Sequence, residues 1–418
     1  MHVIHFGKSD TIIMLYVKEA QAKVLERAAP LEAQSLALGP AVLGWVLAED
    51  VVSDLDMPPY DKSMMDGYAV RTVDLSAGRG DLFVIEEVTA GQIPRLPLEA
   101  GQVTRIMTGA PMPDGADAVI MVERTQMVDG RTVHIEDKPP RPGQNIMRRG
   151  REMRSGEVIL SKGARLRPQE LGLLATVGRT SARVQPAARV AVLSTGEEIV
   201  EAPALPGPGQ IRNGNGPMLM AQVARAGGVP SYSGLARDSL DSLRPLVADG
   251  LRADILVLSG GVSAGKLDLV PGVLEELGVE AVFHKVAMKP GKPVFFGTHR
   301  HASGCMGLVF GLPGNPVSAF VCFELFVRPA LCALMGLDPG PNMLRARLAE
   351  EFTYRTDRQT YHPAVLALDG GAWKVRPVPW LGSPDLRGMA LANALVVIPV
   401  GDQVHRAGTE LDVLAVDN

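Results

Sequence analysis

The stretch at residues 253–268, ADILVLSGGVSAGKLD, constrains the fold more than any other part of the chain. Ile255 to Leu258 form a short, unbroken apolar run, which is typical of a strand buried on both faces of a parallel sheet. Gly260 and Gly261 follow, and two adjacent glycines let the backbone turn sharply and approach a ligand closely. Because apolar residues at helical spacing come next, the stretch predicts a strand, a glycine turn and a helix, the repeating unit of an α/β domain.

The same unit predicts a site for a phosphate-bearing ligand. Backbone N–H groups of a glycine turn and the dipole of the following helix bind anions together. Ser263 adds a hydroxyl group, and Asp268 stands at the start of the helix, where a carboxylate can hold Mg²⁺ against phosphate. The alternative is an ordinary tight turn with Asp268 as a helix cap, and this stretch alone leaves both interpretations open.

Residues 188–336 repeat the alternation of strand and helix, which predicts a doubly wound parallel sheet with helices on both faces. In such sheets, ligands bind beyond the carboxyl ends of the strands. We therefore expect five loops to meet at one edge: those with Glu197 and Glu198, with Asp238, with Ser259–Asp268, with Lys289 and Lys292, and with Gly311–Asn315. Acids, two lysines and two helix N-termini on one rim suit a phosphate ligand with a divalent metal ion.

The rest of the chain predicts further units, as expected for 418 residues. The helical pattern recurs over 15–28, over 35–50, and over 164–180. Short alternating apolar runs predict a β-rich section over 72–150 and, after a linker rich in glycine and proline, a small β domain over 343–418. Residues 1–13 differ in pattern from the helical segment after them, and we expect Met14 to be the natural start.

Two segments outside the α/β region carry unusual groups of charges. The loop MPPYDKSMMDGYAVR places Asp61 and Asp66 around two methionines, which is unusual for plain surface. The segment 145–160 holds the densest basic cluster of the chain, from Arg148 to Arg154 around Glu152. The first segment is otherwise a loop packed on its own domain, and the second is either a solvated turn or a clamp on an anionic ligand.

The composition argues against several classes of function. Lys and Arg number 42 against 46 Asp and Glu, and only 5% of residues are aromatic, so no nucleic-acid surface is expected. No apolar run approaches the roughly 20 residues of a membrane span, and no secretion signal opens the sequence. Three cysteines without a CxxC pair indicate reduced thiols, which predicts a cytoplasmic protein.

A series of motifs resembles, in the right order, the molybdopterin molybdenumtransferase family, which includes the bacterial enzyme (MoeA) and the C-terminal domain of gephyrin. In the α/β region the motifs are STGEE, SGGVSAGKLD, KPGKPVFFG and GLPGNPVSAF; elsewhere they are PPYDKSMMDGYAVR, RIMTGAPMPDGAD, NIMRRGRE and ANALVVIP. The resemblance implies four domains: a discontinuous helical domain (14–50 plus 155–187), an inserted β-rich domain (51–154), an α/β molybdopterin-binding domain (188–336) and a C-terminal β-barrel (343–418).

The implied reaction is insertion of molybdate into adenylylated molybdopterin, with release of AMP and formation of molybdenum cofactor, assisted by Mg²⁺. The resemblance also implies a homodimer whose active site lies between the α/β domain of one subunit and the inserted domain of the other. The molybdopterin adenylyltransferase, which makes the substrate, is an implied partner. The chemistry agrees, because molybdate is a tetrahedral dianion that suits lysine, arginine and hydroxyl donors.

The resemblance implies site residues position by position. The catalytic residues are Asp61, Thr108, Glu152, Glu198, Asp238, Asp268, Lys289 and Lys292, of which Asp238 and Asp268 hold the metal. The residues that bind the substrates are Ser194, Gly260, Gly261, Ser263, Pro293, Pro313, Gly314, Asn315, Ser318, Arg358 and Ser383. Lys292, Pro293, Ser318, Arg358 and Ser383 are expected to hold the oxyanion. Two positions depart from the family pattern, Glu152 and Asn213, where an aspartate is usual.

Three other functions are weighed against this one. A molybdopterin adenylyltransferase shares the strand–SGGxS–helix domain, but that domain stands alone, and segments 35–187 and 343–418 argue against it. A non-catalytic molybdopterin-binding or scaffold protein is disfavoured by the retained acids and lysines. A sugar or nucleotide kinase is compatible with the fold, but the sequence has no GxxxxGK[ST] loop. Molybdate and tungstate, which are of nearly the same size and charge, are not separated by the sequence.

Overall fold

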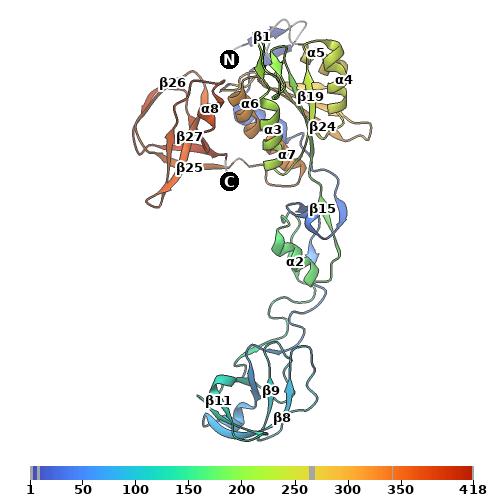
Figure 1. Ribbon diagram of the computed structural model, residues 1–418, viewed down its shortest axis with the longest axis vertical. Coiled ribbons are helices and arrows are strands. Elements are labelled where there is room, and N and C mark those ends of the chain that lie inside the picture. The colour runs from blue at the N-terminus through green and yellow to red at the C-terminus, as the bar shows by residue number, and fades with distance from the viewer. Residues whose placement is uncertain (1–2, 7–9, 263–268, 341, 417–418) are drawn as a thin grey trace. The chain divides into compact units, whose positions relative to one another are not determined.

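The computed structural model describes residues 3–6, 10–262, 269–340 and 342–416 (Figure 1). The chain divides into two compact units. The first unit comprises Met1–Ser35, Gly44–Val46 and Arg183–Asn418, and the second comprises Leu36–Leu43 and Leu47–Ala182. An α/β sheet and a β-barrel make up most of the first unit, whereas the second is built mainly from short strands.

A six-stranded sheet in the order β19-β16-β20-β24-β23-β21 forms the centre of the first unit. Its strands are β16 (Arg189–Thr195), β19 (Val229–Ala236), β20 (Ile255–Ser259), β21 (Glu280–Phe283), β23 (Phe295–Arg300) and β24 (Met306–Leu312). The four strands from β19 to β24 in that order are parallel. Their register places Ser194 directly beside Ser259 at the carboxyl ends of β16 and β20.

Helices cover both faces of this sheet (Figure 1). Because side chains alternate along a strand, Val192 and Val257 pack in one core, and Leu193 and Leu258 pack in the other. The first core includes α1 (Val17–Leu25), α3 (Asn215–Arg225), α6 (Pro316–Cys322) and α7 (Arg328–Leu334); the second includes α4 (Leu240–Gly250) and α5 (Val270–Glu276). Each such buried aliphatic side chain contributes about 1.5–3 kcal/mol. The predicted doubly wound α/β fold is confirmed.

One edge of the sheet differs from the prediction. β23 was not predicted as a strand, and it runs antiparallel to β24, as β21 does to β23. The preceding KPGKP indicates a loop, and this hid the strand that follows it. Since β23 runs against β24, the segment before it, with Lys289 and Lys292, lies at the carboxyl edge of the parallel strands. The two lysines therefore reach the predicted edge by a different connection.

The chain also contains one long apolar helix, in which α6, the π-helical turn η4 (Phe323–Val327) and α7 are continuous. By length and composition the 19 residues Pro316–Leu334 are sufficient to cross a membrane, so the prediction that no apolar run approaches that length is wrong. Within the protein, 83% of this helix is buried, and its phenylalanines pack in the core of the first unit. We therefore interpret it as a core helix.

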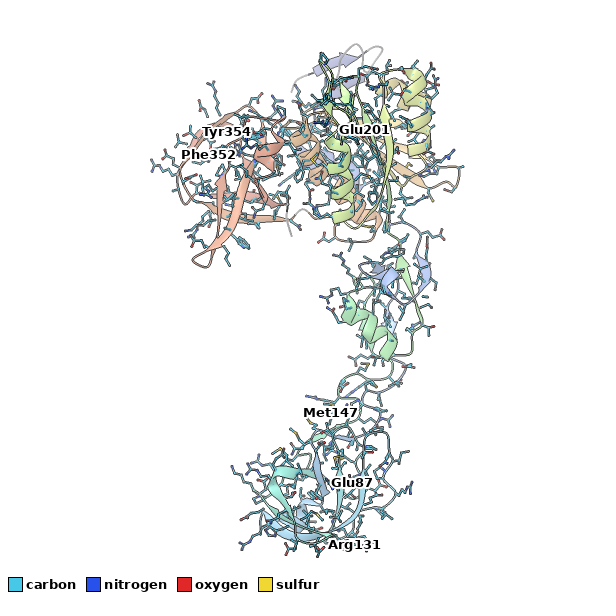
Figure 2. The ribbon with its side chains drawn as sticks, viewed as in Figure 1. Glu87, Arg131, Met147, Glu201, Phe352 and Tyr354 are labelled. Carbon is cyan, nitrogen blue, oxygen red and sulfur yellow. The ribbon has the colours of Figure 1, made fainter. Side chains whose placement is uncertain are left out.

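A closed β-barrel follows, as predicted for the C-terminal region. Five strands close it in the order β27-β28-β25-β31-β29, because β29 also pairs with β27. The strands are β25 (Met343–Leu348), β27 (Gln359–Asp369), β28 (Ala372–Pro377), β29 (Ala394–Ile398) and β31 (Glu410–Ala415), with the pair β26 (Phe352–Thr356) and β30 (Gly401–His405) and the short helix α8 (Leu386–Met389) beside them. Phe352 and Tyr354, labelled in Figure 2, stack with ring centroids 5.7 Å apart.

The second unit contains a six-stranded sheet in the order β10-β7-β9-β8-β12-β11, which fits the predicted β-rich section. Its strands are β7 (Gly67–Val70), β8 (Arg79–Val88), β9 (Gln102–Ile106), β10 (Ala118–Met121), β11 (Thr125–Met127) and β12 (Thr132–Glu136). Two short pairs lie outside this sheet, β6 (Lys62–Ser63) with β13 (Ile146–Met147), and β5 (Val51–Val52) with β14 (Val158–Leu160). The helix predicted over 164–180 is α2 (Pro168–Thr176).

The helix predicted over 35–50 is wrong. This segment contains only the 3₁₀ turn η1 (Pro40–Val42), between β3 (Gln34–Ala37) and β4 (Val46–Leu47). Gly39, Pro40 and Gly44 interrupt the apolar spacing, and Gly44 has a left-handed backbone with φ of 84°. The remaining described strands are β1 (Val3–Phe6), β2 (Asp10–Ile13), β15 (Ser181–Gln185), β17 (Ile199–Val200), β18 (Ile211–Arg212) and β22 (Met288–Lys289).

Candidate functional site

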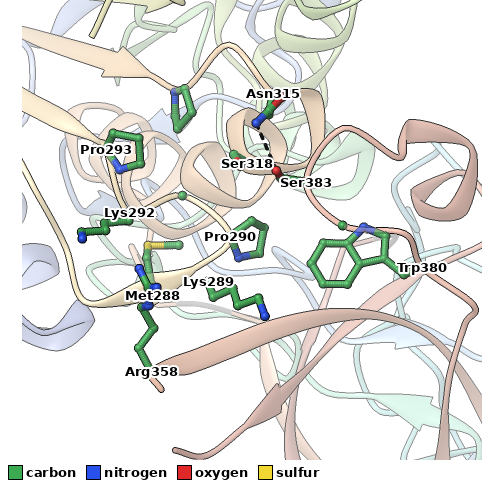
Figure 3. A pocket seen from close by; sticks show the side chains of 13 residues that line it. Met288, Lys289, Pro290, Lys292, Pro293, Asn315, Ser318, Arg358, Trp380 and Ser383 are labelled. Carbon is green, nitrogen blue, oxygen red and sulfur yellow. Dashed lines mark hydrogen bonds between the residues drawn. The ribbon is translucent and has the colours of Figure 1, made fainter. Parts of the chain in front are cut away.

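The first unit holds a pocket of about 260 Å³ at the carboxyl edge of the sheet, which we call the lysine pocket (Figure 3). Eight of the predicted site residues line it: Lys289, Lys292, Pro293, Pro313, Asn315, Ser318, Arg358 and Ser383. Trp380 stands at one end of it and Lys292 at the other. Sequence reasoning missed Trp380, because a lone tryptophan in the barrel gives no signal of its own.

Two different parts of the first unit supply the cations of the lysine pocket. Lys289 ends β22, which pairs with β27 of the barrel, and its ammonium lies 5.2 Å from the centre of the Tyr354 ring. Arg358 precedes β27, and its guanidinium holds both carboxylate oxygens of Asp357 at 3.0 Å. The hydrogen bond from Arg358 lowers the pKa of Asp357. With Lys292, three cations line a pocket whose other polar side chains are two serine hydroxyls, the Asn315 amide and the Trp380 indole, which suits a small oxyanion.

Asn315 connects this pocket to its neighbour. It is the N-cap residue of α6, with Pro316 as the first helical residue. Its side chain does not cap the helix, however, but donates from Nδ2 to Ser383 Oγ at 3.1 Å. The Val317 N–H donates to the Ser383 carbonyl at 3.0 Å, so a loop of the barrel region is fixed to the first turn of α6.

A second pocket of about 420 Å³ lies beyond the ends of β16, β20 and β24, and we call it the asparagine pocket. Four of the predicted site residues line it: Ser194, Glu198, Gly314 and Asn315. Asn213, Asn215 and Ser259 line it too. The signal for Ser259 was available, because it ends a predicted strand at the edge where ligands bind. The structure therefore brings residues from four of the five predicted loops around two pockets that share Asn315.

The glycine turn directly follows Ser259, which lines the asparagine pocket. Gly260 and Gly261 have φ of 96° and 66°, which L side chains adopt only with strain. A Cβ at Gly260 would lie 2.5 Å from the Thr195 carbonyl, and one at Gly261 would lie 2.6 Å from Val270. Only glycine therefore fits both positions. Ser263 and Asp268, the other predicted residues of this turn, lie outside the described residues.

The described acids of the predicted rim, Glu197, Glu198 and Asp238, lie on two loops that contact each other. The Asp238 N–H donates to Glu197 Oε1 at 2.9 Å, and Arg237 donates to the Glu197 carbonyl. Among the described residues no three His, Cys, Asp or Glu side chains form a group ready for a metal ion. Mg²⁺ takes oxygen ligands, often only one or two carboxylates beside substrate phosphates, so the chemistry of Asp238 fits this ion.

The second unit gathers the other predicted acids near β6 and β13. Asp61 accepts hydrogen bonds from the Arg148 guanidinium at 2.5 Å and from the Arg149 N–H at 2.8 Å. Partial burial alone would raise the pKa of Asp61, but these two donors outweigh it, and the pKa lies below its ordinary value. Lys62 lies 3.4 Å from Glu152, so the longer acid at this position still reaches a cation.

Thr108 is tied to a different acid of the same loop. Its N–H and its hydroxyl both donate to Asp66 Oδ1 at 2.7 Å, and these bonds lower the pKa of Asp66. Asp56, which sequence reasoning missed, holds the Arg149 guanidinium at 2.7 Å. Its sequence signal was its place just before the MPPYD motif. Of the three predicted residues, Asp61 thus bonds to the predicted arginine cluster, whereas Thr108 bonds to Asp66 and Glu152 to Lys62.

These folds and pockets define a multidomain protein with a ligand-binding α/β sheet and a C-terminal barrel. Residues 15–178 match the family described as "MoeA N-terminal region (domain I and II)", residues 191–333 match the "Probable molybdopterin binding domain", and residues 345–416 match the "MoeA C-terminal region (domain IV)".

Named relatives cover nearly the whole chain. The molybdopterin molybdenumtransferase of Staphylococcus aureus (strain Mu50) is 34% identical over 409 residues, 96% of each chain, and that of Bacillus subtilis (strain 168) is 35% identical over 378 residues, 88% of this chain and 87% of the relative. A solved structure, "molybdopterin biosynthesis moea protein from Pyrococcus horikosii", is 32% identical with a TM-score of 0.80, covering 97% of this chain and 100% of that one. The chain belongs to the molybdopterin molybdenumtransferase family, and the predicted resemblance is confirmed.

Proposed function

We propose that this enzyme inserts molybdate into adenylylated molybdopterin, with Mg²⁺-dependent release of AMP, and so forms molybdenum cofactor. The observation that carries the proposal is the pair of pockets joined at Asn315. One pocket is lined by three cations and two serine hydroxyls, and the other by amides, hydroxyls and one charge of each sign, Glu198 and Arg212. An oxyanion substrate and a large heterocyclic substrate would therefore meet at one edge of the sheet.

The proposed division of roles follows the chemistry of each pocket. Molybdate would be held in the lysine pocket by Lys292, Pro293, Ser318, Arg358 and Ser383, with Lys289 beside them. Adenylylated molybdopterin would lie along the asparagine pocket and the glycine turn, in contact with Ser194, Gly260, Gly261, Ser263, Pro313, Gly314 and Asn315. Cations and hydroxyl donors stabilise the dianion, and backbone N–H groups at the turn suit its phosphate.

Acids would control the cleavage of the adenylyl bond. Asp238, with Asp268, would hold Mg²⁺, which supplies charge neutralisation at the phosphates when it is bound. Glu198 stands at the wall of the asparagine pocket. Asp61, Thr108 and Glu152 would come from the inserted domain of the other subunit in a homodimer with shared sites. The four-domain division, a cytoplasmic location and contact with the molybdopterin adenylyltransferase belong to the same proposal.

A transfer experiment tests the proposed product. The purified enzyme is incubated with adenylylated molybdopterin, Mg²⁺ and molybdate, and the mixture is given to a molybdenum enzyme that lacks its cofactor. We expect activity of the recipient enzyme only when molybdate is present, with tungstate and sulfate as the anion controls. Tight binding of the adenylylated substrate without any gain of recipient activity would instead indicate a carrier or scaffold.

A further inference from the structure

Three side chains from separate elements form a hydrogen-bonded chain at the wall of the asparagine pocket. Asn213 lies just before α3, Tyr232 is in β19, and Glu201 follows β17 (Figure 2 labels Glu201). Asn213 Nδ2 donates to the Tyr232 hydroxyl at 2.8 Å, and that hydroxyl donates to Glu201 Oε1 at 2.7 Å. Asn213 is only 5% exposed, although it lines the pocket.

The donor and acceptor roles in this series of hydrogen bonds are fixed at both of its ends. The Gly216 N–H donates to Asn213 Oδ1 at 3.0 Å, and a backbone N–H can only donate, so the amide oxygen must face α3. The amide nitrogen therefore faces Tyr232. At the other end, the Glu201 carboxylate can only accept, so the Tyr232 proton must point to it. Burial and the Glu201 carboxylate raise the pKa of Tyr232, which keeps its hydroxyl protonated as a donor.

The same series of hydrogen bonds determines which hydroxyl groups of the pocket wall can donate to a ligand and which can accept. The Ser194 hydroxyl donates to Asn213 Oδ1 at 3.2 Å, so it presents lone pairs to the pocket. Asn215 Nδ2 uses its two hydrogens on Ser259 Oγ and on the Gly314 carbonyl, each at 2.7 Å, which leaves the Ser259 proton to donate. Two adjacent serines thus offer one acceptor and one donor, which match a heterocycle edge that carries both.

Asn213 and Tyr232 also pack against the first turn of α3. A Cβ at Gly216 would lie 3.0 Å from Asn213 Nδ2 and 3.1 Å from Tyr232 Cε2, so a glycine lets both side chains pack against the helix. Asn215 is the first residue of this helix, and Gly214 is its N-cap residue. Asn213, one residue before the N-cap, accepts the N–H of Gly216 in the first turn through its Oδ1. A shift of Asn213 would therefore move both Ser194 and the start of α3.

We propose that Tyr232 and Glu201 are positioning residues for the adenylylated substrate, acting through Asn213, and that the three form a matched set. The inference rests on the proposed function, whose substrate it concerns. With an aspartate at 213, two carboxylates would compete for the single Tyr232 proton. A neutral amide at Asn213 is thus what the Tyr232–Glu201 pair requires.

A double-mutant cycle on the full chain tests this set: Asn213→Asp, Glu201→Gln, and both together. The readout is the dissociation constant of adenylylated molybdopterin without molybdate, between pH 5.5 and 8. We expect Asn213→Asp to weaken binding about tenfold at pH 8 and to recover as the pH falls, because protonation of one carboxylate restores a donor. Glu201→Gln alone should cost less than about threefold, since an amide oxygen still accepts.

The double variant is the decisive member. In the double variant the amide nitrogen introduced by Glu201→Gln would donate to the Tyr232 hydroxyl. That hydroxyl would donate to the carboxylate introduced by Asn213→Asp, so both hydrogen bonds would form again with donor and acceptor exchanged. We therefore expect wild-type affinity to return and the pH dependence to disappear. Other charged groups near the chain are Glu198 and Arg212 on the pocket wall and Glu197 and Arg237 on the next loop, and all four are kept in every variant. Additive losses in the double variant would overturn the inference.

Two further measurements separate positioning from general stability and from the proposed function. Tyr232→Phe should raise the KM for adenylylated molybdopterin about fivefold and leave the KM for molybdate unchanged, with the exposed Tyr16→Phe as the matched control. An equal rise in both KM values would contradict positioning. The same three variants are also compared with the wild type by their free energies of unfolding, and this measurement needs no ligand. A wild type that binds no adenylylated substrate contradicts the proposed function, whereas additive unfolding free energies contradict the inference.

Discussion

At the scale of single residues, the charges of the lysine pocket are set by their immediate neighbours. Arg358 is held by Asp357, whose side chain is 72% exposed, so the guanidinium is oriented while much of its charge stays available. Lys289 lies over Tyr354, which limits where its ammonium can go. These partners come from the barrel, and no spacing in the sequence predicts them. What the sequence did predict was which residues end strands at this edge.

Replacement of Arg358 by alanine tests the role of the pocket in binding molybdate. We expect the KM for molybdate to rise about 10- to 100-fold, because a charge-assisted hydrogen bond to the dianion is lost, while the KM for adenylylated molybdopterin changes little. Arg355→Ala is the matched control, because Arg355 lies in the same barrel region, is 86% exposed and pairs only loosely with Asp402 at 3.8 Å. Equal losses for both substrates would remove Arg358 from the oxyanion site.

At the scale of elements, periodicity predicted the buried strands and the helices between them, because each apolar run is uninterrupted. It failed where glycine and proline occur within a run. Gly39 and Pro40 broke the helix expected over 35–50, and KPGKP concealed β23. The arginine cluster at 148–154 was visible in sequence, but its pairing with Asp61, 87 residues away, depends on the fold of the second unit.

The glycine turn after β20 gives a prediction for stability. Gly260→Ala should lower the free energy of unfolding by about 2 kcal/mol or more, because alanine must adopt a left-handed backbone and its Cβ meets the Thr195 carbonyl. Gly272→Ala, in α5 with nothing within 4 Å of the new Cβ, is the matched control and should raise it by about 0.5–1 kcal/mol. Urea unfolding measures both. Equal effects of the two substitutions would show that the turn is not constrained as described.

His362 packs among the rings of Phe352, Tyr354 and Trp380, and it gives a prediction for the pH dependence of stability. Burial lowers the pKa of His362, and Lys289 adds to this against the hydrogen bond to the Pro363 carbonyl. Below about pH 6.5 the imidazole of His362 therefore takes up a proton in the unfolded chain but stays neutral in the folded chain. The packing of the neutral imidazole stabilises the fold above that pH. This contribution is lost as the pH falls, and the free energy of unfolding then decreases by at most about 1.4 kcal/mol per pH unit.

Unfolding in urea between pH 7.5 and 5 checks this sign. His362→Leu should flatten the fall of the unfolding free energy below pH 6.5. Phe352→Leu, which removes a ring 5.1 Å from His362 but no titrating group, should lower stability without changing the slope. A His362→Leu variant with the wild-type slope would show that another group causes the acid sensitivity.

At the scale of the whole molecule, the proposed active site needs residues of both units, and the resemblance assigns them to two subunits. Mixed dimers test this arrangement. Asp61→Asn and Lys292→Ala should each be inactive alone. If the sites are shared, a dimer of one of each has one intact site, so a random mixture should regain about one quarter of wild-type turnover. The mixture must be unfolded and refolded together, or coexpressed, so that the subunits exchange.

A mixture that stays inactive, although light scattering shows dimers and tandem-tagged purification recovers the mixed species, would place Asp61 and Lys292 in the same subunit's site. A monomer in solution would contradict the shared site outright. Either result would leave the two pockets of the first unit as described, since those do not depend on a partner.

The central claim is tested most directly by AMP release from adenylylated molybdopterin. The purified enzyme, Mg²⁺ and the adenylylated substrate are mixed with increasing molybdate, and AMP is followed by chromatography. We predict release that depends on molybdate, saturates with its concentration and falls to background when Mg²⁺ is chelated. AMP release independent of molybdate, or tight binding with no release at any concentration, would contradict the account and direct attention to the altered positions Glu152 and Asn213.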